Sequence, residues 1–203
     1  METSQYRFTF ERKMNEVFEA LELDPKRALK IIQKEIDQRG KKIDANIMHS
    51  LRVVRAMVLD RNNRIEEARE EIFGVFTAMK ESNTVDHYLL DTLQRTTSRM
   101  QESKLFTTKY LEVVEHLQGQ NTGDKELTFK LYEGSLMYNK FAKAAKMAAK
   151  MVQAFNEPSF SLPQVQCLYM DSQPWLGGSQ SPMTLQLAIA FAEKYMNANQ
   201  AAN

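Results

Sequence analysis

The sequence is poor in the features that secreted and membrane-embedded proteins need. Its 203 residues include one cysteine, Cys167, which excludes an internal disulfide and fits a reducing compartment. We expect Cys167 to be a small buried apolar residue rather than a reactive thiol. No stretch approaches the roughly 18 uncharged apolar residues of a membrane-spanning helix, and the start METSQYRFTF lacks the apolar segment of a signal peptide. These absences predict a cytoplasmic protein with no membrane partner.

An excess of charge of one sign is also lacking. Lysine and arginine number 27 against 26 aspartates and glutamates, so the formal net charge is +1. The whole chain is therefore not predicted to bind nucleic acid or an acidic surface through its overall charge. Any such role requires a local patch of basic residues.

The motifs of common catalytic sites are missing as well. There is no Cys-x-x-Cys, no phosphate-binding loop and no G-x-G-x-x-G, and Gly177-Gly178 is predicted to form a turn. His49, His87 and His116 stand at spacings that no metal motif uses. The Arg/Gln-x-x-Gly-x-Gly/Ala loop with which acetyltransferases hold acetyl-CoA is also absent. We therefore expect a non-enzymatic protein without metal, cofactor or small-molecule substrate.

What the sequence does contain is helix-forming residues in a 3.6-residue period. Glycine and proline are few, at 7 and 5, which favours an all-α chain. The stretch 44–82 predicts two antiparallel helices joined by the short polar turn Arg61-Asn62-Asn63. The apolar stripe of the first helix is Ile47, Leu51, Val54 and Val58, and that of the second is Ile65, Ala68, Ile72, Val75, Phe76 and Met79.

The stripe of the second helix recurs along the chain. Adding 76 to its positions gives Phe141, Ala144, Ala148, Met151, Val152 and Phe155, all apolar. Adding 38 fails only at Ser103, and subtracting 40 keeps Ala28, Ile32 and Ile36 but fails at Glu35 and Arg39. A helical pair repeated every 36 to 40 residues predicts a right-handed α-solenoid of tetratricopeptide-like hairpins.

We expect residues 1–203 to form a single helical-repeat domain. The predicted hairpins cover about 10–38, 44–82, 84–118 and 124–155, with further helices at about 162–171 and 182–197. Asp24-Pro25 and Ser181-Pro182 are predicted helix starts, because the acceptor side chain can cap free amides and proline suits the first turn. Thr122 or Asp124 is expected to cap the helix that follows.

Three surfaces are candidates for binding. Lys140, Lys143, Lys146 and Lys150 lie on one side of a predicted helix and could contact RNA phosphates, although solvated helix faces often look the same. A second basic group, diluted by Glu35 and Asp37, surrounds the helix 25–38. The last helix is apolar on more than one side, and Leu187, Phe191 and Tyr195 are predicted to meet a partner.

Three segments add a resemblance to a known family. Residues 15–76, beginning NEVFEALELDPKRALKIIQKEIDQRG, together with MYNKFAKAAKMAAKMVQAFNEPSFSLPQVQCLYMDS at 137–172 and SPMTLQLAIAFAEKYM at 181–196, resemble the auxiliary subunit of the NatB N-terminal acetyltransferase, N-terminal repeats only. The order and spacing agree over nearly the whole chain. The resemblance implies a non-catalytic tetratricopeptide scaffold whose partners are the NatB catalytic subunit and the ribosome with its RNA.

Two other functions remain open from the sequence. One is a generic tetratricopeptide adaptor that binds peptide tails, which requires lysine and asparagine residues lining a groove. The other is an RNA-binding helical-repeat protein, which requires a base-contacting residue at one fixed position in every repeat. The variable repeat length disfavours the second.

Overall fold

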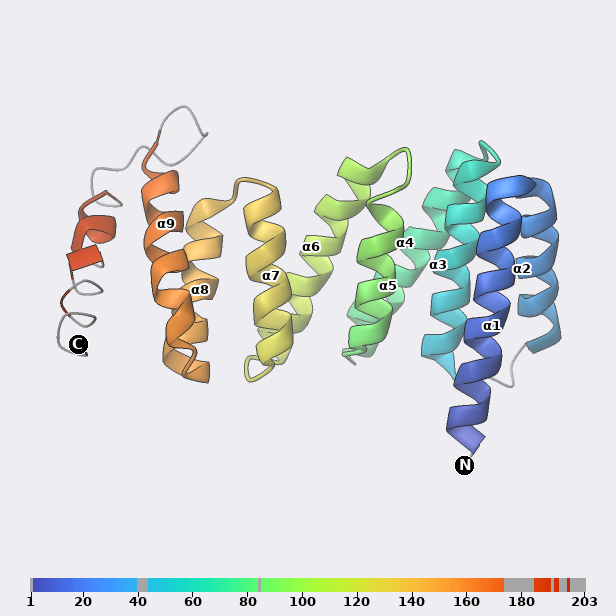
Figure 1. The fold of residues 1–203 in the computed structure, drawn as a ribbon, viewed down its shortest axis with the longest axis horizontal. Coiled ribbons are helices and arrows are strands. Elements are labelled where there is room, and N and C mark those ends of the chain that lie inside the picture. Colours follow the sequence, from blue (N-terminus) through green and yellow to red (C-terminus); the bar gives the residue numbers. More distant parts are fainter. Residues whose placement is uncertain are drawn as a thin grey trace. The chain divides into compact units, whose positions relative to one another are not determined.

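The structure is a computed structural model that describes residues 2–39, 44–83, 85–173, 185–190, 192–193 and 197, with the backbone alone for 2–11 and 39. Every regular element in these ranges is a helix (Figure 1). The all-α helical-repeat fold predicted from the sequence is thereby confirmed. The chain divides into two compact units, Met1–Val113 and Val114–Asn203. The single domain expected from the sequence stays a prediction.

The first unit is built from successive helical hairpins. Its helices are α1 (Glu2–Leu23), α2 (Pro25–Arg39), α3 (Ala45–Arg61), α4 (Ile65–Ser82), α5 (His87–Thr97) and the first part of α6 (Ser103–Gln120). Helix α1 packs on α2, α3 packs on α4, and α3 also contacts α2 and α5 (Figure 1). Helices α3 and α5, the first helices of neighbouring hairpins, therefore lie side by side, which is how stacked helical repeats bury a continuous core.

The second unit continues the same construction. Helix α7 (Lys125–Met137) packs on α8 (Phe141–Phe155), and α8 packs on α9 (Ser161–Asp171). A single 3₁₀ turn, Pro158–Phe160, leads into α9 and also contacts α8. Its Phe160 ring stands edge-on to Tyr132 of α7, with centroids 5.3 Å apart. Aromatic packing thus fixes the turn before α9 against α7 of the α7–α8 hairpin.

The repeat register derived from the sequence matches the burial of the side chains. Ala28, Ala68, Phe106 and Ala144 occupy equivalent positions in the four second helices, and each is 0% exposed. One turn later, Ile32, Ile72, Tyr110 and Ala148 are also buried. Even Glu35, where the apolar pattern fails, lies at the inward position and is 6% exposed. The inward face is therefore set by position in the repeat, even at Glu35, where the residue type departs from the apolar pattern.

Aspartates begin the helices and asparagines end them. Asp24 accepts hydrogen bonds from the amides of Lys26 and Arg27 at 3.0 and 3.1 Å. The Asp44, Asp86 and Asp124 side chains cap α3, α5 and α7 in the same way. Of the two residues predicted to cap the helix α7, Thr122 and Asp124, the aspartate is the one that does so. Asn63, Asn83, Asn139 and Asn156 adopt the left-handed conformation with φ between 51° and 60°. Asparagine tolerates this conformation well, so helix ends form here without glycine.

Helix α1 begins before the predicted start near residue 10, and α5 is followed by a turn that faces the core. Helix α1 already begins at Glu2, whereas the sequence pattern suggests a start near Phe10. Helix α5 ends at Thr97, so Met100 reaches the core from a turn and is 4% exposed. The turn is held because the backbone N–H of Gln101 donates to the Asp60 carboxylate of α3, at 3.2 Å. Periodicity alone does not distinguish an inward turn residue from a further helical one.

Candidate functional site

A groove runs over the first helices of the first three hairpins. It encloses about 370 Å³ and is lined by Met14 and Phe18 of α1, Ser50, Val54 and Met57 of α3, Tyr88, Asp91, Thr92, Arg95 and Thr96 of α5, and Arg99 of the following turn. We call it the α1–α3–α5 groove. Because these helices stack side by side within one unit, the groove is a direct product of the repeat geometry.

This groove is apolar along its floor and cationic at one end. The Phe18 and Tyr88 side chains are 42% and 49% exposed, so the groove presents two large rings to solvent. Arg95 and Arg99 are exposed and have no ion-pair partner among the described residues. Aromatic rings and arginine are the residues that most often anchor protein partners. The arrangement suits a protein segment with apolar and acidic side chains.

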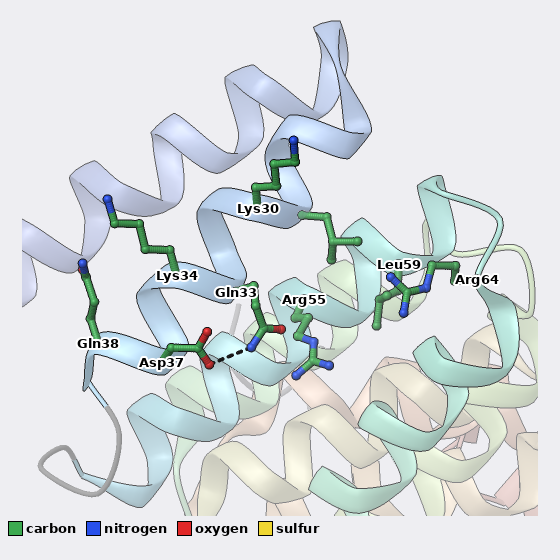
Figure 2. A pocket seen from close by; sticks show the side chains of 9 residues that line it. Lys30, Gln33, Lys34, Asp37, Gln38, Arg55, Leu59 and Arg64 are labelled. Atoms are coloured by element: carbon green, nitrogen blue, oxygen red, sulfur yellow. Dashed lines mark hydrogen bonds between the residues drawn. The ribbon is translucent and has the colours of Figure 1, made fainter.

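A second groove lies between α2 and α3 and encloses about 570 Å³ (Figure 2). We call it the α2–α3 groove. Its lining consists of Leu29, Lys30, Gln33, Lys34, Asp37, Gln38, Arg55, Leu59 and Arg64. Four of these side chains are cationic and one is acidic. Leu59 is 1% exposed and Leu29 is half-buried against the core. The lysine and arginine side chains therefore supply the charged groups of the lining, and their aliphatic stems supply much of its apolar surface.

Ion pairs neutralise only part of that positive charge. Arg64 donates to both carboxylate oxygens of Glu67. Glu71 accepts from Arg52 at 2.7 Å and lies 3.3 Å from Arg55, so one carboxylate serves two guanidinium groups. The Asp37 carboxylate accepts from Gln33 at 2.8 Å, as Figure 2 shows. Lys30 and Lys34 have no ionic partner among the described residues. The groove therefore keeps a net positive charge.

The lysines that the sequence predicts as an RNA contact lie along α8 in different environments. Lys143 pairs with Glu115 of α6 at 2.5 Å. The Lys150 ammonium lies 6.0 Å from the centre of the Phe155 ring, and partial burial lowers its pKa. Lys140 stands at the N-cap position of α8 without a side-chain capping hydrogen bond, and it and Lys146 are exposed. The structure thus places the four residues on one helix but leaves only two as free surface cations. An RNA contact here stays a prediction.

The predicted partner surface near the C-terminus is described only in part. Residues 185–190 are helical, and Leu185, Leu187 and Ile189 are 40%, 44% and 51% exposed, while Ala188 is buried at 3%. Phe191 and Tyr195 lie outside the described residues. The exposure of Leu187 is compatible with a partner surface, which stays a prediction.

Burial shifts the pKa of two described groups that lie outside both grooves. Cys167 is 1% exposed behind Ala144 and Ala145, and burial raises the pKa of its thiol to about 11 despite a hydrogen bond with Tyr132. Burial lowers the pKa of His49. Among the described residues no group of His, Cys, Asp and Glu side chains could hold a metal ion. Nor is any helix in those ranges long and apolar enough to cross a membrane.

Sequence analysis missed the α1–α3–α5 groove and the α2–α3 groove as sites. The residues that line each groove come from separate segments of the chain, so no local sequence motif predicts either groove. The signals available were Phe18 and Tyr88 at the edge of their helical stripes, and the basic residues around α2. Spacing could not reveal that Glu115 would neutralise Lys143, because these residues are 28 positions apart.

Comparison with known proteins agrees with the helical-repeat architecture. No curated protein and no solved structure matches the chain. The family model described as "Psidin, N-terminal TPR repeats region" matches residues 11–203, which is all but the first ten residues. Tetratricopeptide repeats are protein-interaction modules, so binding to protein partners is the role that this architecture supports. The chain belongs to the family of Psidin N-terminal tetratricopeptide-repeat regions.

Proposed function

We propose that the chain is a non-catalytic, cytoplasmic auxiliary scaffold of the NatB N-terminal acetyltransferase, holding a separate catalytic subunit and supporting association with ribosomes. The observation that carries the proposal is the co-linear resemblance of residues 15–76, 137–172 and 181–196 to the NatB auxiliary subunit. Residues 15–76 and 137–172 fall on helices of a tetratricopeptide-repeat chain, as such a scaffold requires. The family match supports the scaffold architecture, and the NatB assignment rests on the resemblance.

The surfaces of the chain are compatible with capture of a protein subunit. The α1–α3–α5 groove exposes Phe18 and Tyr88, and Leu187 is exposed near the C-terminus. Burying such side chains against a partner stabilises a complex by about 1.5–3 kcal/mol each when burial is complete. Both surfaces are therefore candidate contacts for the catalytic subunit.

The test is co-expression of the full chain with the NatB catalytic subunit of the same organism. We expect a soluble complex that survives size-exclusion chromatography, and self-association or aggregation of the chain alone. Two double variants separate the surfaces, namely Phe18→Asp with Tyr88→Asp and Leu187→Asp with Phe191→Asp. We expect the second pair to abolish the complex and to improve the solubility of the lone chain. If the chain alone is monodisperse and forms no complex with the catalytic subunit, the NatB assignment is refuted.

A generic adaptor for peptide tails is the second candidate, favoured by the shape of the α1–α3–α5 groove. The residues that line this groove include no lysine or asparagine, the types expected of a site for peptide carboxylates. Arg95 and Arg99 could supply the positive charge instead. Co-purification from the native cells, with partners identified, distinguishes the candidates. A NatB subunit as the main partner supports the first, and a set of unrelated proteins sharing an acidic terminal segment supports the second.

A further inference from the structure

Three lysines form a straight line of charge along α2. Lys26, Lys30 and Lys34 are spaced by four residues, so they lie on one side of the helix and one turn apart. With a rise of 1.5 Å per residue, the line extends over about 12 Å. All three side chains are exposed and have no ionic partner among the described residues. We call these residues the α2 lysine face.

The α2–α3 groove extends this face sideways. Lys30 and Lys34 belong to both, and Arg55 and Arg64 border the groove from the neighbouring hairpin. Gln33 and Gln38 add neutral side-chain amides that can donate hydrogen bonds. The opposing acids are Asp37, which accepts from Gln33, and Glu67 and Glu71, which are held by arginines. The surface between Lys26 and Lys34 therefore carries a net positive charge, which the three acids reduce without cancelling it.

The arrangement favours an extended polyanion over a single phosphate group. Figure 2 shows the labelled cations spread along the groove, with Lys30, Lys34 and Arg64 pointing in different directions rather than toward one point. A compact anion needs converging donors, whereas a nucleic-acid backbone presents phosphates in a row. The lack of exposed aromatic or large apolar groups in the groove argues against a protein partner and against insertion into a membrane.

We propose that the α2 lysine face, with the adjoining α2–α3 groove, binds the phosphate backbone of RNA without sequence preference. The identification of that RNA as ribosomal rests on the proposed function, but RNA binding itself does not. Recognition is through phosphate contacts from lysine and arginine and through hydrogen bonds from the glutamines. The α8 lysines are the weaker site, because Lys143 is paired and Lys150 is partly buried.

The test measures binding of the full chain to fluorescent RNA oligonucleotides by anisotropy at several salt concentrations. Lys26→Glu, Lys30→Glu and Lys34→Glu are combined in one variant. The matched control combines Lys140→Glu, Lys146→Glu and Lys150→Glu, which reverses the same number of charges on the other helix. Circular dichroism checks that both variants keep the helical content and thermal midpoint of the parent. Two RNAs of different base composition report on sequence preference.

We expect the α2 variant to lose at least tenfold in affinity at moderate salt, and the α8 control to lose no more than about threefold. Three lost phosphate contacts should also reduce the slope of log K against log salt by about 2, at roughly 0.7 per contact on a single strand. Equal losses in both variants, or a parent that does not bind RNA, would overturn the proposal. Tighter binding to phosphatidylserine vesicles or to a polyglutamate peptide than to RNA would overturn it too. If the α2 variant loses RNA binding but still forms a complex with the NatB catalytic subunit, RNA binding and subunit binding are independent functions of the chain.

Discussion

Helices α2 and α8 share an inward face and differ in their outward faces. Ala28 and Ala144 occupy equivalent inward positions, and both are completely buried. On the outward side, the lysines of α2 form an unpaired line, whereas Lys143 of α8 is paired with Glu115. The repeat therefore constrains the positions that pack between helices and leaves the solvent side free to vary. Function is to be sought in the differences on that side.

The largest effect should come from breaking the shared inward face. Ala144→Glu and Ala28→Glu each bury a charge without a partner at a position that is 0% exposed. We expect each to lower the free energy of unfolding by about 3–5 kcal/mol. The measurement is thermal and urea unfolding followed by circular dichroism.

Ala142→Glu is the matched control, because Ala142 is exposed on the same helix as Ala144. Its midpoint should stay close to that of the parent. If Ala144→Glu unfolds at the same temperature as Ala142→Glu, the equivalence of α2 and α8 in the repeat is wrong.

A smaller effect concerns the thiol behind α8. The folded-state pKa of Cys167 is raised to about 11, above the ordinary value of 9.0. The unfolded chain therefore releases this proton first, and stability falls as pH rises from about 9 to about 11. The loss is at most about 3 kcal/mol for a shift of this size.

Cys167→Ala supplies the comparison for this alkaline loss. The parent should be the more stable protein at pH 7, since the alanine leaves a small cavity. The difference in unfolding free energy between the two proteins should shrink above pH 9. A difference that stays constant up to pH 11 would contradict a buried neutral thiol.

Co-sedimentation with ribosomes compares the lysines on the outward faces of α8 and α2. Replacing Lys140, Lys143, Lys146 and Lys150 by glutamate should reduce co-sedimentation at low salt, and the reduction should be smaller at high salt, where phosphate contacts are already screened. The combined α2 variant should reduce it further, although it changes one residue fewer. If the α8 variant sediments like the parent at every salt concentration, the α8 lysines form only a solvated face.

The smallest expected effect comes from removing the ion pair between Lys143 and Glu115. Glu115→Gln removes the ionic partner of Lys143, and the pair is partly exposed, so we expect a stability change of no more than about 1 kcal/mol. RNA binding should rise by no more than about threefold, because one more cation becomes available on α8. Weaker RNA binding by this variant would show that the pair positions the lysine instead of neutralising it.

Much of the fold could be predicted from the sequence because repeats impose regular spacing. The shift of 76 residues identified Phe141, Ala144, Ala148 and Met151 as inward, and all four are buried. Aspartate caps were readable for the same reason, since a capping side chain acts on amides only two or three residues away. Asparagine also stands at helix ends, at Asn63, Asn83, Asn139 and Asn156, but no helix end was predicted from it.

The candidate surfaces were less predictable. The sequence indicated the α8 lysines and the basic residues of α2 alike, and it ranked α8 first because no acid interrupts the run from Lys140 to Lys150. In the structure Lys143 is paired with Glu115 of α6, whereas Lys26, Lys30 and Lys34 have no ionic partner among the described residues. The α1–α3–α5 groove could not be foreseen either, since Met14, Val54 and Tyr88 meet only when three hairpins stack.

The sequence by itself determined the helical class, the repeat and the inward face of each second helix. These properties follow from local hydrogen bonding and from a 3.6-residue period, which act over a few residues. Only the tertiary structure decided which charges stay free and where grooves open. Ion pairs such as Lys143–Glu115 and Arg69–Glu102 join residues 28 and 33 positions apart, and their geometry exists only after the helices have packed.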